Sequence, residues 1–131
     1  MLVDTSVWID YFNGHSSPQS DRLADAIAGG ESIALPGLVW TEILLGIRND
    51  EEAARIAGLL DAFEYVPEPN RSDYVAAAGI YRGCRSRGYT VRSTIDCVLA
   101  QLCIRDQRAI LCKDRDFQAI SRCFPLRPVE S

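Results

Sequence analysis

Short apolar runs alternate with longer amphipathic segments along the whole chain, and this alternation restricts the fold more than any other feature. Four apolar runs are short enough to be buried strands: 1–3, 33–35, 63–66 and 109–112. Helical spacing and capping residues predict seven helices, over 6–12, 21–28, 37–46, 50–62, from Asn70 or Ser72 to about Arg87, 94–105 and 116–123. Strands that alternate with helices form parallel sheets covered by those helices. The sequence therefore predicts a three-layer α/β fold, with a central parallel sheet of four to five short strands and helices on both faces.

Size and composition fit a single domain over residues 1–131. Of the 131 residues, 47% are hydrophobic and 24% are charged, as in ordinary folded proteins. The uncharged stretch 32–41 is about half as long as a membrane-spanning helix, so we expect no membrane segment. The N-terminus carries Asp4 and Asp10 but no basic region, which argues against a signal peptide. The five cysteines include no C-x-x-C pair, and we interpret them as reduced core residues of a cytoplasmic protein.

Five carboxylates stand where a lone surface charge is not expected. Asp4 closes the first apolar run, and Asp114 and Asp116 follow the last one. Glu42 and Asp96 each interrupt an apolar segment. An ionised carboxylate is costly to bury unless positive charge compensates it, and a divalent cation is the natural partner of several together. The pattern indicates metal-assisted phosphodiester chemistry at the carboxyl ends of the strands, where parallel sheets bind their ligands.

Each acid also has a purely structural interpretation. Asp4 suits the N-cap of the helix that follows it. Asp96 stands three residues after Ser93, which is the spacing of a capping box. Asp114 and Asp116 could form a turn and a helix start. A shared site accounts for all five acids at once, whereas the structural interpretations require five separate coincidences.

Four segments, taken in order, resemble the PIN-domain ribonucleases, specifically the VapC-type toxins of bacterial toxin–antitoxin pairs. They are VDTSVWI at 3–9, EILLG at 42–46, VRSTIDC at 91–97 and DRDFQAI at 114–120. Each segment alone is a weak signal, but the four together cover essentially the whole chain. One departure is Lys113, where relatives often carry a histidine, and this lysine could pair with a neighbouring acid.

The resemblance implies an active site made of Asp4, Glu42, Asp96, Asp114 and Asp116. The four aspartates would bind Mg²⁺, or Mn²⁺ in its place, directly or through water, because these hard ions prefer oxygen ligands. Glu42 would orient or deprotonate the attacking water. The ion would polarise the phosphate, lower the pKa of water and stabilise the leaving oxygen.

Substrate contacts are expected beside these acids. Thr5 and Ser6 occupy the place of the family's small hydroxyl residues next to the first aspartate. The segment 81–92 carries four arginines and two tyrosines, which can pair with phosphates and stack on unpaired bases. We therefore expect an RNA-contacting edge that includes Arg87 and Arg92. A basic helix C-terminus is the alternative and accounts well for Arg87.

The charge distribution is uneven along the chain. Residues 1–70 hold 12 acidic and 3 basic residues, net −9, while residues 71–131 hold 6 acidic and 11 basic residues, net +5. A basic surface beside an acidic pocket would suit an enzyme that acts on a polyanion, and chance segregation of surface charge is the alternative.

The resemblance further implies a toxin that cleaves RNA, arrests growth and is neutralised by a VapB-type antitoxin. It also implies a homodimer and a toxin–antitoxin hetero-oligomer. Trp8 and Trp40, although apolar enough for the core, are candidates for a groove that receives an antitoxin helix. The alternatives are an inactive PIN-fold binding module and an aspartate-based phosphatase. The phosphatase predicts a second acid two residues after Asp4, where Ser6 stands. The sequence identifies neither the RNA nor the number of metal ions.

Overall fold

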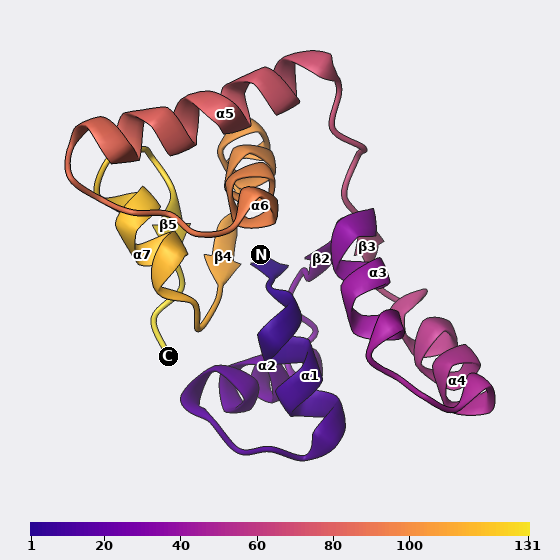
Figure 1. The fold of residues 1–131 in the computed structure, drawn as a ribbon. Helices are drawn as coiled ribbons and strands as arrows, with labels where there is room; N and C mark the ends of the chain where they lie inside the picture. The colour runs from indigo at the N-terminus through magenta and orange to yellow at the C-terminus, as the bar shows by residue number, and fades with distance from the viewer.

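The computed structural model describes residues 1–131 as five short strands and seven helices (Figure 1). The strands are β1 (Leu2–Val3), β2 (Ala34–Leu35), β3 (Glu64–Tyr65), β4 (Ala109–Leu111) and β5 (Arg127–Pro128). The helices are α1 (Thr5–Asn13), α2 (Pro18–Ala28), α3 (Gly37–Leu45), α4 (Asp50–Leu60), α5 (Arg71–Ser86), α6 (Thr94–Asp106) and α7 (Arg115–Ser121).

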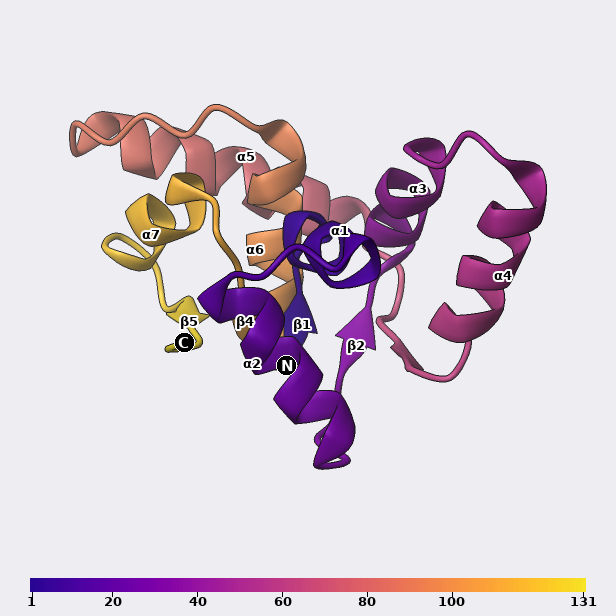
Figure 2. The ribbon, with the colours of Figure 1, turned by 90° about the horizontal axis from the view of Figure 1, so that it is seen from below.

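All the strands pair in parallel, in the order β3-β2-β1-β4-β5. The first strand of the chain therefore lies in the middle of the sheet. Strands β2 and β3 lie on one side of β1 within the sheet, and β4 and β5 lie on the other side. Helices α1 and α2 lie on one side of the strands and α5 on the other (Figure 1, Figure 2). The predicted three-layer α/β fold is confirmed, and the order of the strands reverses between β1 and β4, where ligand crevices form in such sheets.

Two elements differ from the predicted ones by more than one or two residues at an end. Helix α2 begins at Pro18 rather than at residue 21, because Ser17 accepts a hydrogen bond from the Ser20 N–H and completes a capping box with it. Strand β5 was not among the apolar runs, and it ends in Pro128. A proline has no N–H for a ladder, so it is tolerated at an edge strand such as this one.

One connected core of buried apolar side chains joins the sheet to its helices. Trp8 is fully buried, stacks on Phe12 with 5.7 Å between ring centroids, and meets the edge of Phe63 at 5.1 Å. The hypothesis that Trp8 lines a partner groove is therefore wrong, because its ring is part of this core. Trp40 is only partly buried and lines an open cleft with Tyr65.

The cysteines are all free, and four of the five are buried. None of the seven helices combines the length and the apolar character that crossing a membrane requires.

Candidate active site

Parallel pairing brings the carboxyl ends of β1 and β4 together. Leu2 is in register with Ile110, and the Asp4 N–H donates a hydrogen bond of 2.9 Å to the Leu111 carbonyl. Asp4 leaves the sheet at this point, and Asp114 follows the end of β4 by a short loop. Both acids thus reach the same edge of the sheet from segments more than 100 residues apart in the sequence.

A cleft of about 440 Å³ opens at this edge, and we call it the acidic cleft. Its lining residues are Asp4, Thr5, Ser6, Ile9, Glu42, Ser93, Asp96, Lys113 and Asp114. Four of the five acids singled out in the sequence therefore line a single cleft. They come from the β1–α1 junction, α3, α6 and the loop before α7.

Two hydroxyl groups orient two of these acids. The Ser6 hydroxyl donates to Asp4 Oδ2 at 3.2 Å, and the Thr5 hydroxyl donates to Glu42 Oε1 at 2.9 Å. Asp4 is the N-cap residue of α1, as the structural interpretation predicted, but its side chain makes no capping hydrogen bond. Capping therefore does not account for its carboxylate. Burial raises the pKa of Asp4 to about 6, with hydrogen bonds from Thr5 and Ser6 opposing the shift and Glu42 adding to it.

Asp96 has a buried carboxylate oxygen with no hydrogen-bond partner. The Ser93 hydroxyl caps α6 by accepting from the Asp96 N–H at 3.2 Å. The reciprocal bond of a capping box is absent, because the Ser93 N–H donates to Asp116 Oδ2 at 3.0 Å instead. Asp96 Oδ2 is left buried and unpaired. Burial, followed by the neighbouring Asp114 carboxylate, raises the pKa of Asp96 to about 8.

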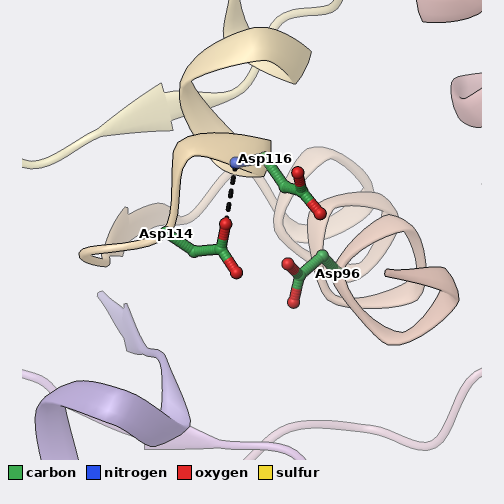
Figure 3. A group of neighbouring side chains, drawn as sticks. All are labelled: Asp96, Asp114 and Asp116. Carbon is green, nitrogen blue, oxygen red and sulfur yellow. Dashed lines mark hydrogen bonds between the residues drawn. The ribbon is translucent and has the colours of Figure 1, made fainter. Parts of the chain in front are cut away.

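Asp96, Asp114 and Asp116 form a cluster in which one carboxylate oxygen from each residue lies within 4.8 Å of the others. Figure 3 shows Asp114 and Asp116 entering from the start of α7, and Asp96 facing them from α6. Asp114 is also the N-cap of α7, since its Oδ1 accepts from the Asp116 N–H at 2.9 Å. Its other oxygen stays available. Three converging carboxylates repel one another, and their hard oxygen donors suit Mg²⁺ or Mn²⁺.

Asp116 has a second task that the sequence did not reveal. Its Oδ2 accepts hydrogen bonds from the backbone N–H groups of Arg92 at 2.9 Å and Ser93 at 3.0 Å. These bonds fix the loop that leads into α6 and thereby set the position of Asp96. No sequence signal points to this contact, because it joins a side chain to backbone atoms more than 20 residues away.

A second cleft, of about 460 Å³, shares Ser93 and Asp114 with the acidic cleft and carries two cations, Arg92 and Arg115. Arg92 therefore lies beside the acids, as expected of a substrate-contacting residue. Arg87 is exposed at the C-cap of α5 and lines neither cleft. The structure thus separates the two arginines that the sequence had grouped. Arg115 was not among the residues predicted from the sequence. A cation between Asp114 and Asp116 could have indicated a substrate contact.

Comparison with known proteins gives a consistent result. The family model of the PIN domain matches residues 1–122. Ribonuclease VapC11 of Mycobacterium tuberculosis and VapC ribonuclease Mb1587 of Mycobacterium bovis are each 34% identical over 128 residues, which cover 97% of this chain and 96% of the relative.

Two solved structures share the fold. One is VapBC2 from Rickettsia felis bound to a DNA fragment from the promoter, with a TM-score of 0.74 and 15% identity. The other is VapBC-1 from nontypeable Haemophilus influenzae, with a TM-score of 0.73 and 16% identity. Each match covers 98% of this chain and 96% of the other.

Proposed function

The chain belongs to the PIN domain family, and from this premise we propose that it is a divalent-metal-dependent endoribonuclease and the toxin of a VapBC-type pair. Relatives that are named as ribonucleases and match along nearly its full length support the activity. The observation that carries the metal dependence is the buried, unpaired Asp96 Oδ2 beside two further carboxylates. A protein rarely leaves such an oxygen without a partner, and a cation supplies one.

The metal ligands that we propose are Asp4, Asp96, Asp114 and Asp116, with Mg²⁺ as the natural ion and Mn²⁺ as a substitute. When bound, the ion would stabilise negative charge on the reacting phosphate and on the leaving oxygen. Two hydrogen-bonded contacts support this assignment. Ser6 orients Asp4, and Asp116 holds the loop from which α6 presents Asp96.

Glu42 is the candidate general base. It lines the acidic cleft but is not part of the three-aspartate cluster, and Thr5 fixes one of its oxygens, Oε1. The other oxygen is free to take a proton from an attacking water. In the proposed reaction that water forms a new bond to phosphorus, the bond from phosphorus to the leaving ribose oxygen breaks, and the leaving oxygen gains a proton. Arg92 would pair with a neighbouring phosphate.

A VapB-type antitoxin is the partner that we propose, in the cytoplasm, with a homodimer of this chain in the complex. The α3–α4 pair lies away from α7 (Figure 1, Figure 2) and exposes Leu45 at 74% and Leu59 at 46%. An open cleft of about 460 Å³ beside α3 is lined in part by Leu38 and Trp40. Apolar side chains along a helix pair suit the apolar face of an amphipathic helix.

The test combines cleavage of RNA in vitro with sequencing of new 5′ ends after induction in a bacterium. Wild-type protein with Mn²⁺ is expected to produce discrete ends and to arrest growth, and EDTA to abolish cleavage. Asp4→Asn is expected to lower the cleavage rate at least about 100-fold, because it removes a charged group from the transition-state site. Asp25→Asn, the same change on the exposed face of α2, is the control and should retain full activity. Absence of cleavage of cellular RNA by the wild type with either metal would instead support an inactive PIN-fold binding module.

A further inference from the structure

Lys113 is the only lysine in the chain, since the other thirteen of its 14 basic residues are arginines. It lies in the loop between β4 and α7, directly before Asp114. It is also the only cation among the nine residues that line the acidic cleft. A single positive side chain thus stands in a cleft that carries four carboxylates.

Asp10 holds this lysine at one wall of the cleft. Lys113 Nζ lies 2.5 Å from Asp10 Oδ2, and the two side chains are 38% and 13% exposed. Asp10 follows Ser6 by one turn of α1, so the pair stands next to residues that line the cleft. The Asp10 carboxylate also accepts from the Ser17 hydroxyl at 3.4 Å. Asp10 therefore keeps a second partner when the lysine leaves.

The ion pair is of a kind that another anion can replace. Partly exposed pairs contribute little to stability, because water and salt screen them. A lysine ammonium is a compact charge on a flexible stem, and it binds phosphate as a point charge without a fixed geometry. The four carboxylates of the cleft repel a phosphate chain wherever metal does not neutralise them. A cation inside the cleft lowers this repulsion at the point where the RNA backbone passes it.

We propose that Lys113 binds a phosphate of the RNA next to the scissile one, exchanging the Asp10 carboxylate for a phosphate oxygen. The inference rests on the proposed function and adds a substrate-binding residue to it. Asp10 then competes with the phosphate for the ammonium, and it holds the ammonium at the wall of the cleft only in the absence of RNA. Arg92 and Arg115 serve the adjoining cleft, so phosphates on both clefts have a cationic partner.

Steady-state cleavage of a single-stranded RNA with Mn²⁺ tests the exchange. Lys113→Gln is expected to raise KM about tenfold with kcat changed less than about threefold, and Lys113→Arg to restore KM. A plot of log(kcat/KM) against the logarithm of the salt concentration has a negative slope. In Lys113→Gln this slope should become shallower by roughly 0.7, as for the loss of one phosphate contact on a single strand. Asp10→Asn should lower KM, because the lysine is free from the start. Arg22→Gln removes a cation that is paired with Glu31 on α2, and it should change neither KM nor the slope.

Unchanged KM and salt slope in Lys113→Gln would overturn the proposal. Equal losses of kcat in Lys113→Gln and Asp10→Asn, with KM unchanged, would show that the pair only ties α1 to the β4–α7 loop.

A binding measurement keeps the proposal separate from the proposed function. Reductive methylation with ¹³C-formaldehyde labels two amines, Lys113 and the N-terminus, and preserves their charge. Addition of RNA to labelled Asp4→Asn protein is expected to shift the Lys113 signal and not that of Met1, whose amino group donates to the Ser32 carbonyl. A shift without cleavage by the wild type would refute the nuclease and leave the phosphate site standing. Cleavage by the wild type with no shift of the Lys113 signal would support the nuclease and refute the phosphate site at Lys113.

Discussion

Glu42 is held differently from the aspartates around it. It comes from α3, it is half-buried, and one of its oxygens already accepts a hydrogen bond from Thr5. It is not a member of the Asp96–Asp114–Asp116 cluster. An acid with one fixed oxygen and one free oxygen can accept a proton without moving, which suits the general-base role proposed for Glu42 better than the role of a metal ligand.

Glu42→Gln is therefore expected to remove activity and to leave the fold and the metal site intact. The amide oxygen can still accept from Thr5, but the side chain can no longer take up a proton. We expect kcat to fall by about 100- to 10,000-fold, the usual contribution of a general base, with the melting temperature and the Mn²⁺ affinity nearly unchanged. Single-turnover cleavage, thermal unfolding and Mn²⁺ titration measure the three quantities. Full activity in this variant would remove Glu42 from the mechanism.

At the scale of elements, α5 shows how closely a helix can be fitted to its neighbour. A Cβ atom placed on Gly83 would lie 2.6 Å from the ring of Phe124, which follows α7 in the chain. A Cβ atom placed on Gly79, one turn earlier in the same helix, would have no atom within 4 Å. The first glycine permits close packing, whereas the second only weakens the helix.

The two glycines of α5 make a matched pair of substitutions. Gly83→Ala is expected to destabilise the protein by about 1–3 kcal/mol, because the added methyl group overpacks a tight contact. Gly79→Ala is expected to stabilise it by about 0.5–1 kcal/mol through helix propensity alone. Urea unfolding measures both free energies. If both substitutions changed the free energy of unfolding equally, the Phe124 ring would be able to move aside at no energetic cost. If Gly83→Ala is destabilising as expected, adding Phe124→Leu should restore part of the lost stability.

The elements that the sequence predicted well carry their own local signals. Asn70, one of the two predicted caps, does cap α5 by accepting from the Asp73 N–H, and Ser93 caps α6 as expected. The acids could be found because charges that interrupt apolar runs need a reason. Strand β5 could not be found, because two residues ending in proline have no strand pattern. The hydrogen bonds from the loop before α6 to Asp116 could not be predicted either, because they depend on tertiary packing and no local sequence pattern indicates them.

For the molecule as a whole, two buried carboxyls link folding to pH. The pKa values of Asp4 and Asp96 are raised by burial to about 6 and about 8. In the unfolded chain both groups ionise near pH 4. Between these values the unfolded state has lost protons that the folded state retains, so the folded state becomes less favourable as the pH rises. The other carboxyls with shifted pKa values, such as Asp73, all have lowered pKa values, and their contribution to stability is fully present above pH 5.

The metal-free protein is therefore expected to lose stability from pH 5 to pH 8. Asp96→Asn should raise the free energy of unfolding at pH 8 by at least about 1 kcal/mol, since it removes an uncompensated charge. Mn²⁺ should stabilise the wild type at pH 8, because it binds the ionised carboxylates of the folded state only. It should have little effect on Asp96→Asn. Thermal unfolding at both pH values, with EDTA or with Mn²⁺, gives these comparisons. A wild type that is equally stable at pH 5 and pH 8 without metal would contradict the linkage.

The central place of β1 in the sheet also bears on the order of events during protein synthesis. Strands β1, β2 and β3 and helices α1 to α4 are complete by residue 65, whereas the three-aspartate cluster requires residue 116. A nascent chain can therefore present its α3–α4 pair for several seconds before its acids can assemble. Translation itself therefore completes this apolar helix pair before it completes the cluster proposed to bind metal. An antitoxin of the kind proposed above, if already present in the cell, would therefore meet each new chain before its acidic cleft is complete.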